Sequence, residues 1–403
     1  MVGNASGNSP SLMASVILSA ARTPVGSFGG SLSSVPAPEL GATAINGALD
    51  RAGVAKDQVH EVILGNVVTA GEGQAPARQA ALGAGLPQSV HCMTINKVCG
   101  SGMKAVMLAD QAIRAGDAQV VVAGGMENMS QAPFYLPKAR YGYGYGNGEL
   151  VDGLFHDGLR DAYDGVAMGV AADACGETCG VPRERQDAFS IESYRRAQAS
   201  VENGAFAEEI VPVTVPGRKG DTVVDTDEEP ARTNFDKIPQ LRPVFSKEGT
   251  VTAANASTIN DGAAALVVAS AEWAEANGKT PLARIVATSQ HSQAPMEFTT
   301  APIEAVNKVL AKAGLTLDDI DLFEVNEAFA VVALAAQDAL GIPSEKLNVR
   351  GGSVAVGHPI GASGARILTT LLHAMVERDA KRGLAAICIG GGEATAILVE
   401  RGA

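Results

Sequence analysis

The sequence is poor in cysteine and aromatic residues, has no long apolar runs and carries no excess of positive charge. Only five of its 403 residues are cysteines, an odd number in a long chain, so a disulfide framework is not expected. No apolar run reaches the length of a membrane span. The formal net charge of −13 argues against nonspecific binding to nucleic acids or acidic membranes. An anionic ligand would therefore need a local basic patch.

The few cysteines are spaced in a way that argues against a structural zinc site. They contain no C-x-x-C pair, and the two that lie four residues apart, Cys175 and Cys179, have no nearby histidine. We therefore expect free thiols in a reducing compartment.

The first fifteen residues are small and polar and contain no arginine, and the final RGA is neither an anchor nor a peroxisomal signal. A cytoplasmic location is expected.

What the chain has in abundance is glycine and a repeated pattern. Hydrophobic residues make up 46% and glycines number 46, a composition typical of closely packed α/β enzymes. Residues 44–67 and 305–328 each predict an amphipathic helix ending at Ala-Gly, an acidic turn and an apolar strand with an asparagine. Residues 120–125 and 385–392 each predict a buried strand ending in glycines. Such units recur in any α/β protein, but two matches in the same order favour a duplicated α/β unit with mixed sheets covered by helices.

Residues 129–254 have no counterpart in either repeat and predict an inserted lobe. Its sequence contains the tyrosine- and glycine-rich YGYGYGNG and several charged helices. Basic residues gather in its second part: Arg218, Lys219, Arg232, Lys237, Arg242 and Lys247. They form either a solvated face or a docking surface for a phosphorylated ligand.

Cys99 stands in NKVCGSGMKA, directly before a predicted helix whose apolar residues from Met103 to Ile113 recur at helical spacing. A helix N-terminus stabilises a thiolate, which predicts a lowered pKa for Cys99. The free N–H groups of the first turn can also hold an oxyanion. Gly100 and Gly102 would let a substrate approach the backbone. Taken alone, a cysteine in this position is more often a small buried apolar residue.

Three further motifs change that balance. His358 lies in the glycine-rich GGSVAVGHPIGASGARI, and by itself leaves structure and function equally open. Cys388 ends an apolar strand before three glycines, and Asn326 and Glu327 end another, where open α/β sheets place ligand sites. A thiolate nucleophile needs a base such as histidine. A second thiol becomes useful if a proton must leave the carbon next to a thioester, which indicates a Claisen condensation or its reverse.

The chain resembles the thiolase family along nearly its whole length. NKVCGSGMKA, NEAFA, GHPIGASGAR and CIGGG are similar to the four active-site blocks of that family, in family order. The resemblance implies the thiolase fold, with duplicated α/β halves in five αβαβα layers and an inserted loop domain. It assigns residues 14–128 and 255–280 to the N-terminal half and 281–403 to the C-terminal half. Residues 129–254 would be the loop domain, which binds coenzyme A and makes oligomer contacts.

The resemblance also implies catalytic roles. Cys99 would carry the acyl group, and His358 would activate it and donate to a first oxyanion hole. Asn326 would hold the water that completes this hole. Cys388 would be the acid/base that takes a proton from the acetyl methyl group. The backbone N–H groups of Cys99 and Gly390 would form a second oxyanion hole.

Within the family, the likeness is to members that condense two acetyl-CoA molecules into acetoacetyl-CoA and coenzyme A, and that assemble as homotetramers. No tightly bound cofactor is expected. The implied ligand contacts are Arg232, Thr233, Asn234 and Lys237 for the nucleotide, Ser257 for pantetheine, and Met168 and Phe298 for the acyl pocket. Tyr194, Ala253, Ala254, Ala256 and Val354 match the potassium ligands of a mitochondrial member. Because four of these five are small apolar residues, potassium binding and plain packing both stay open.

The sequence departs from the family pattern in three places, and other functions stay open. Ala167 stands where a histidine is common, Ala394 replaces a glycine, and residues 135–152 differ from the usual tetramerisation segment. A β-ketoacyl synthase would pair its cysteine with two histidines, or with histidine and asparagine, rather than with a second cysteine. A protein that binds acyl-CoA or lipid without catalysis would have lost the cysteine or the histidine. A 3-ketoacyl-CoA thiolase of broader or longer chain length is the remaining alternative.

Overall fold

The structure is a computed structural model that describes residues 14–402. The sequence segment from which we expect no targeting signal lies almost wholly outside these residues, as does the last residue of the chain. Between residues 14 and 402, no helix combines the length and apolar character needed to cross a lipid bilayer.

The main sheet is built from two copies of one four-stranded unit. Its order is β12-β13-β14-β11-β1-β10-β5-β3-β4, so the first half contributes β3-β5-β10-β1 and the second half contributes β12-β13-β14-β11. In both units the first pair is parallel and the others are antiparallel. The units join where β1 pairs with β11. The predicted duplication is confirmed.

The strands of the sheet have the following bounds. The first half holds β1 (Ser15–Arg22), β3 (Glu61–Gly65), β4 (His91–Ile95), β5 (Val120–Asn128) and β10 (Asn260–Ser270), with the short β2 (Gly26–Ser27) beside β10. The second half holds β11 (Ala283–Ser292), β12 (Leu322–Val325), β13 (Arg382–Ile389) and β14 (Glu393–Glu400). Most strand residues are buried on both faces, as their nearly unbroken apolar runs predict.

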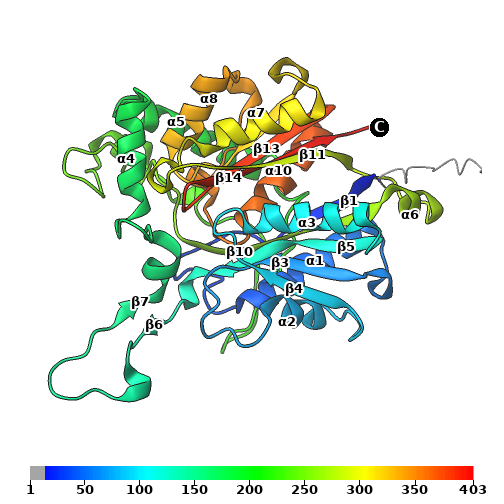
Figure 1. Ribbon diagram of the computed structural model, residues 1–403, viewed down its shortest axis with the longest axis horizontal. Coiled ribbons are helices and arrows are strands. Elements are labelled where there is room, and N and C mark those ends of the chain that lie inside the picture. Colours follow the sequence, from blue (N-terminus) through cyan, green and yellow to red (C-terminus); the bar gives the residue numbers. More distant parts are fainter. Residues whose placement is uncertain (1–13, 403) are drawn as a thin grey trace, which may run out of the picture.

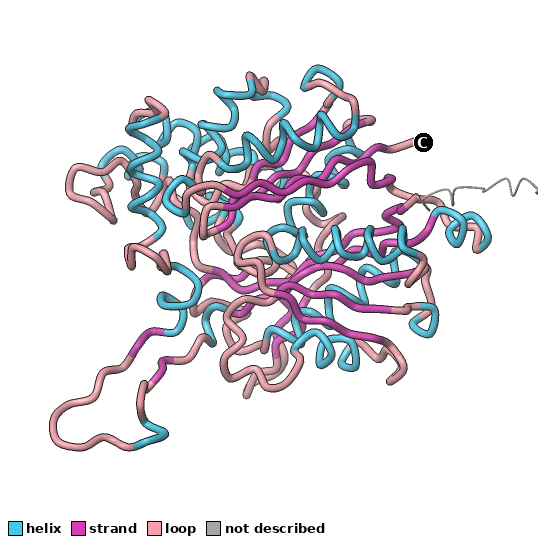
Figure 2. Tube along the Cα trace, viewed as in Figure 1, coloured by secondary structure: helices cyan, strands magenta, loops and turns pink. Residues whose placement is uncertain are grey.

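Helices form three layers around the two halves of the sheet, as Figures 1 and 2 show. The outer layers are α1 (Ala37–Ala52) with α2 (Pro76–Gly83), and α7 (Ala301–Ala313) with α8 (Ala330–Leu340). Between the half-sheets lie α3 (Ser101–Ala115) and α10 (Ser363–Glu377), which contact each other and strands of both halves. Separate apolar clusters fill each outer layer, and a third fills the centre. The five-layered α/β arrangement is therefore the one that the sequence predicts.

The repeated sequence pattern gives the same local structure twice. The helices α1 and α7 both end at glycines in the left-handed conformation, Gly53 with φ 57° and Gly314 with φ 67°. A short 3₁₀ turn follows each helix and leads into β3 or β12. Asn66 and Asn326 come directly after these strands, and both are buried. Each half therefore presents a buried amide at the carboxyl end of a matching strand.

Residues 129–254 form a hairpin, two long helices and several short turns. The hairpin of β6 (Phe134–Tyr135) and β7 (Val151–Asp152) extends away from the body in Figure 1 and exposes Tyr141 and Tyr145. The helices α4 (Met168–Thr178) and α5 (Arg183–Glu202) pack against α8, and α5 also contacts α9 (Ser353–Val356). The remaining elements are β8 (Val213–Val215), β9 (Thr222–Val224) and, after this segment, α6 (Ala271–Ala276). The domain boundaries given above stay a prediction.

A buried ion network ties this segment to the first half. The Arg22 guanidinium lies 2.6 Å from Glu209 and 2.7 Å from Asp227, with all three side chains fully buried. Glu209 also accepts from Arg350, at 3.2 Å. Removing one partner of such a network would leave a buried charge uncompensated, at a cost of about 3–5 kcal/mol.

Candidate active site

A cavity of about 580 Å³ with a mostly apolar wall collects many of the predicted site residues. Those that line it are Cys99, His358, Gly390, Met168, Phe298, Ser257, Arg232, Ala253 and Ala256. Asn326 and Cys388 do not line it; both are buried. Because Asn326 is followed by the lining residues Ala328 and Phe329, and Cys388 by Gly390, both lie within two residues of the cavity wall along the chain.

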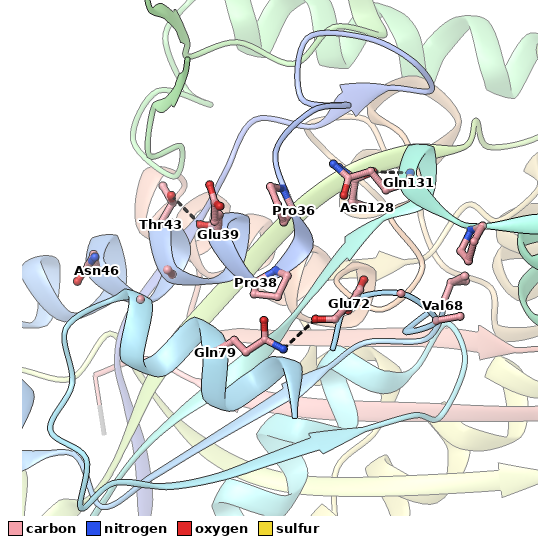
Figure 3. Close-up of a pocket in the computed structure, with 15 residues that line it drawn as sticks. Pro36, Pro38, Glu39, Thr43, Asn46, Val68, Glu72, Gln79, Asn128 and Gln131 are labelled. Atoms are coloured by element: carbon pink, nitrogen blue, oxygen red, sulfur yellow. Dashed lines mark hydrogen bonds between the residues drawn. The ribbon is translucent and has the colours of Figure 1, made fainter. Parts of the chain in front are cut away.

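A second cavity of about 700 Å³ contains none of the predicted site residues. Figure 3 shows it between α1, α2 and the chain around Val68 and Gln131. Its lining includes neither cysteine nor histidine. Several of its polar groups bond to one another, as when the side chain of Gln79 donates to the carbonyl of Glu72. The chemistry expected from the sequence therefore belongs to the first cavity.

A strained turn carries Cys99 to the start of α3. Val98 has φ 46°, which is uncommon for a β-branched residue and is typical of over-determined functional sites. The Ser101 hydroxyl holds the turn, since it accepts from the backbone N–H of Lys97 at 2.8 Å and donates to the carbonyl of Val98 at 2.7 Å. Local hydrogen bonds thus fix the backbone on which the thiol stands.

The glycines beside Cys99 serve packing rather than substrate access. A Cβ on Gly100 would lie 2.4 Å from the side chain of Ile389, and one on Gly102 would lie 2.7 Å from the backbone nitrogen of Ala365. Neither distance is possible without displacing its neighbour. The prediction that these glycines clear space for a substrate is therefore wrong, because the space is taken by β13 and α10.

The thiol of Cys99 is not acidic in this structure. Burial raises its pKa to about 11, although the backbone N–H groups of Gly390 and of Cys99 itself act in the opposite direction. The predicted lowering of this pKa is therefore wrong, because desolvation of the thiolate outweighs the N–H groups. The same two N–H groups converge on one sulfur atom. They are the pair that the resemblance assigns to the second oxyanion hole.

The imidazole of His358 is held as a neutral base. Its Nδ1 lies 2.6 Å from the Ser363 hydroxyl, which itself donates to the carbonyl of Pro359 at 2.8 Å. Since a hydroxyl has one proton to donate, Nδ1 is the N–H that donates to Ser363, which leaves the lone pair on Nε2. Burial, with help from the charge of Arg366, lowers the pKa of His358 to about 3. Nε2 is buried without a partner in residues 14–402, so it is free to accept a proton.

Asn326 leaves its amide nitrogen free. Its backbone N–H donates to the carbonyl of Ala386 at 3.0 Å, which fixes the end of β12 against β13. Its side-chain oxygen accepts from the Ser353 hydroxyl at 2.6 Å. Its Nδ2 is buried and has no partner in the part of the chain that the structure describes. An orphaned buried donor costs free energy, so its presence indicates that a bound water or ligand completes it.

Cys388 lies near the end of β13, opposite Ala394 of β14. Burial, and next the proximity of Cys99, raise its pKa well above the usual value. It belongs to an apolar cluster with Phe298, and Met168 packs against the same cluster. A thiol in these surroundings is protonated at rest and becomes a strong base once it has lost its proton.

Of the residues predicted to contact the nucleotide and pantetheine of coenzyme A, only Arg232 and Ser257 line the cavity. Arg232 lines the cavity, whereas Asn234 and Lys237 are exposed and do not. The side chain of Asn234 instead caps the short helix at 235–240 by accepting from Asp236. Ser257 donates to the carbonyl of Ala328 at 2.9 Å. Their contacts with a ligand stay predictions.

The residues predicted to bind potassium fall into two groups. Tyr194 and Val354 pack in one apolar cluster, where burial raises the pKa of the Tyr194 hydroxyl. Ala253 and Ala256 lie in a turn that lines the cavity, and Ala254 lies between them. This site stays a prediction.

Four supporting residues were not predicted from the sequence. Ser353, Ser363 and Arg366 lie in the same glycine-rich stretch as His358, where polar residues among glycines are the available signal. Glu127 is the last residue but one of β5 and is fully buried, and four N–H donors surround its carboxylate. A carboxylate at the end of an apolar strand was the corresponding signal. These residues hold the site rather than line it.

Comparison with known proteins agrees with this geometry. Residues 15–272 match the N-terminal domain of thiolase, and residues 279–401 match its C-terminal domain. Proteins named acetyl-CoA acetyltransferase are 54% identical in Schizosaccharomyces pombe, 55% in Cupriavidus necator and 52% in Pseudomonas aeruginosa. Each alignment covers 96% of this chain and 98–99% of the relative. The chain belongs to the thiolase family.

Proposed function

We propose that the protein is an acetyl-CoA acetyltransferase. It condenses two acetyl-CoA molecules into acetoacetyl-CoA and coenzyme A, reversibly, with an acetyl group held on Cys99 between the two steps. The observation that carries this proposal is the meeting, at one cavity, of a thiol, a free imidazole nitrogen and two N–H groups that converge on the thiol. The names of the relatives support the same activity.

The first step transfers an acetyl group to Cys99. As the sulfur attacks the thioester carbonyl, its proton passes to the unpartnered Nε2 of His358, because a thiol with a pKa of about 11 needs a base at neutral pH. The carbon–sulfur bond to coenzyme A breaks, and the leaving thiolate takes the proton of Cys388. The step ends with acetyl-Cys99, an imidazolium at His358 and a thiolate at Cys388, so charge is conserved.

The second step forms the carbon–carbon bond. The thiolate of Cys388 takes a proton from the methyl group of a second acetyl-CoA. The resulting carbanion attacks the acetyl carbonyl on Cys99, and the carbon–sulfur bond to Cys99 breaks. The imidazolium of His358 and a water on Asn326 stabilise the enolate oxygen of the second acetyl-CoA. The N–H groups of Cys99 and Gly390 stabilise the negatively charged oxygen of the tetrahedral intermediate. His358 finally returns its proton to Cys99, which restores the resting enzyme.

A short acyl chain suits the cavity best. Phe298 and Met168 are among its lining residues; Phe298 belongs to the apolar cluster that contains Cys388, and Met168 packs against that cluster. The experiment that tests the function is a substrate series under reducing conditions, with acetoacetyl-CoA, 2-methylacetoacetyl-CoA and a longer 3-ketoacyl-CoA. We expect thiolysis of acetoacetyl-CoA by free coenzyme A. Absence of that reaction would overturn the proposal, and faster cleavage of the longer substrate would replace it by a broader 3-ketoacyl-CoA thiolase.

Three finer properties complete the proposal. Potassium binds near Tyr194 and raises activity, so equal rates in KCl and NaCl would exclude it.

The protein is a homotetramer, supported by the exposed aromatic residues of the hairpin between β6 and β7, such as Tyr141 and Tyr145. Light scattering of the wild type and of a variant without residues 138–149 tests this assembly. A cytoplasmic location is supported by five free cysteines, and imaging of the tagged full chain tests it.

A further inference from the structure

The amide of Asn326 can serve the proposed reaction in only one orientation. To hold a water through the oxygen of that water, it must present its Nδ2 donor and keep its oxygen away. An asparagine amide is nearly symmetric in shape, so packing alone does not choose between the two orientations. A neighbouring group must therefore donate a hydrogen bond to the side-chain oxygen of Asn326 and must not accept one from its Nδ2.

A chain of two hydrogen bonds makes this choice. Arg366 donates from its guanidinium to the Ser353 hydroxyl at 2.7 Å, and Ser353 donates to the side-chain oxygen of Asn326 at 2.6 Å. A guanidinium has donors only, so Ser353 must accept from Arg366. The proton of Ser353 then goes to its other partner, the oxygen of Asn326. The direction of both hydrogen bonds follows from Arg366, which cannot accept one.

The surroundings of these two hydrogen bonds leave no simple alternative to this arrangement. Ser353 is fully buried, Arg366 is 2% exposed and Asn326 is 1% exposed, so bulk water does not compete for these bonds. Arg366 forms no ion pair within 4.0 Å in residues 14–402, although Glu324 and Glu327 lie close enough to affect its pKa. A buried cation that is not spent on a salt bridge is costly, and a positioning role accounts for its place.

We propose that Ser353 and Arg366 are positioning residues that fix the amide of Asn326 with Nδ2 as the free donor. This inference rests on the proposed function, because it supplies the water site of the first oxyanion hole. Neither residue touches the reacting atoms. Ser363 does the corresponding work for His358, since its hydroxyl accepts from Nδ1 and leaves Nε2 free.

A double-mutant cycle tests the proposal. Ser353→Ala, Asn326→Ala and the double variant are compared for kcat and KM in the condensation of acetyl-CoA. We expect Ser353→Ala alone to lower kcat roughly 10- to 100-fold, with KM within about twofold of the wild type. In the Asn326→Ala background the same change should lower kcat less than about twofold, because the amide that it positions is gone.

Ser190→Ala is the matched control. Its hydroxyl is as buried as that of Ser353, but it donates to Gln186 within α5, so kcat should stay at the wild-type value. If Ser353→Ala is insoluble, Ser353→Cys keeps the volume with a weak donor and should show an intermediate loss.

The outcomes separate this inference from the function on which it rests. Equal losses from Ser353→Ala in both backgrounds would mean that Ser353 acts independently of Asn326, which overturns the inference. A silent Ser353→Ala beside an impaired Asn326→Ala would also overturn it and leave the proposed function intact. A silent Asn326→Ala would instead remove the water site from the proposed mechanism.

Discussion

Asn66 and Asn326 occupy the same position in the two halves of the molecule, yet their amides are used in opposite ways. Asn66 follows β3 and donates from Nδ2 to the carboxylate of Glu127 at 3.0 Å, while its oxygen has no partner in residues 14–402. Asn326 follows β12 and accepts from Ser353 through its oxygen, while its Nδ2 is free. The first amide is consumed by the structure and the second is available for chemistry.

The neighbouring strands differ in the same manner. The parallel register pairs Gly65 with Gly125 in the first half and Val325 with Ala386 in the second. Two residues beyond these pairs, β5 carries Glu127 and β13 carries Cys388, and both are fully buried. Glu127 binds the N–H groups of the loop at 67–68 and of Gly361, whereas the sulfur of Cys388 lies near Cys99.

This difference shows how a duplicated fold makes one active site. Both halves supply a buried polar residue at the end of matching strands. In the first half this residue is a carboxylate that holds the glycine-rich loop of the second half through Gly361. In the second half it is a thiol that can exchange a proton. One half of the molecule therefore holds the loop that carries His358, while the other supplies the thiol that we propose as the acid/base.

Among the substitutions that test this comparison, Cys388→Ala should change activity most. We expect condensation to fall at least about 10³-fold, because the proposed mechanism gives the proton transfer at carbon to Cys388 alone. Acetylation of Cys99 by acetyl-CoA should persist. Rates of acetoacetyl-CoA formation and of acetyl labelling, measured on the same preparation, check both statements. Near-normal condensation would show that the two strand ends do not differ in function.

Asn326→Ala and Asn66→Ala should differ in their effect on activity. We expect Asn326→Ala to lower kcat roughly 100-fold because its free donor is lost, and to lower stability as well, since the buried Ser353 hydroxyl loses its acceptor. Asn66→Ala should cost about 1–3 kcal/mol of unfolding free energy, since it removes one donor from the buried carboxylate of Glu127. Chemical denaturation and steady-state kinetics of both variants test this difference. Equal losses of activity would contradict it.

Glu127→Gln should destabilise the protein without removing its chemistry. The glutamine would point one amide nitrogen at N–H groups that now donate to a carboxylate. We therefore expect the free energy of unfolding to fall by about 1–3 kcal/mol. The effect should appear as a lower unfolding temperature, while the acetylation of Cys99 by acetyl-CoA still proceeds at low temperature. Loss of acetylation in a folded variant would show that Glu127 belongs to the reaction itself.

The pH dependence of alkylation offers the smallest and most specific effect. Because burial raises the pKa of Cys99 to about 11, its thiolate fraction grows about tenfold per pH unit below that value. The rate of iodoacetamide alkylation at Cys99 should therefore rise steadily from pH 7 to pH 10. Peptide mapping against Cys99→Ser identifies the site. A plateau below pH 9 would mean that the N–H groups outweigh burial.

The sequence predicts the fold better than it predicts the environment of the site. Helix, glycine, turn and strand recur with spacings that require only local structure, so Gly53, Gly314 and the two asparagines could be placed in advance. The motifs around Cys99, His358 and Cys388 also indicate the chemistry. These features depend on residues that are neighbours in the chain.

What could not be predicted depends on partners that are distant in the chain. The Ser353–Asn326 bond joins residues 27 positions apart, and the packing of Gly100 against Ile389 joins two halves of the molecule. The pKa of Cys99 follows from desolvation, which is a property of the whole surrounding structure. A helix N-terminus indicated a lowered pKa only because burial cannot be read from the residues beside the thiol.

In the proposed mechanism Cys99 carries the acetyl group, and Cys388 transfers protons but never carries the acyl group. Peptide mass spectrometry after brief incubation with acetyl-CoA tests it most directly, in the wild type, in Cys99→Ala and in Cys388→Ala. The proposed mechanism predicts acetylation of the peptide that contains residue 99 in the wild type and in Cys388→Ala, and none in Cys99→Ala. Equal labelling of Cys99→Ala, or a label on Cys388 in its place, would contradict it.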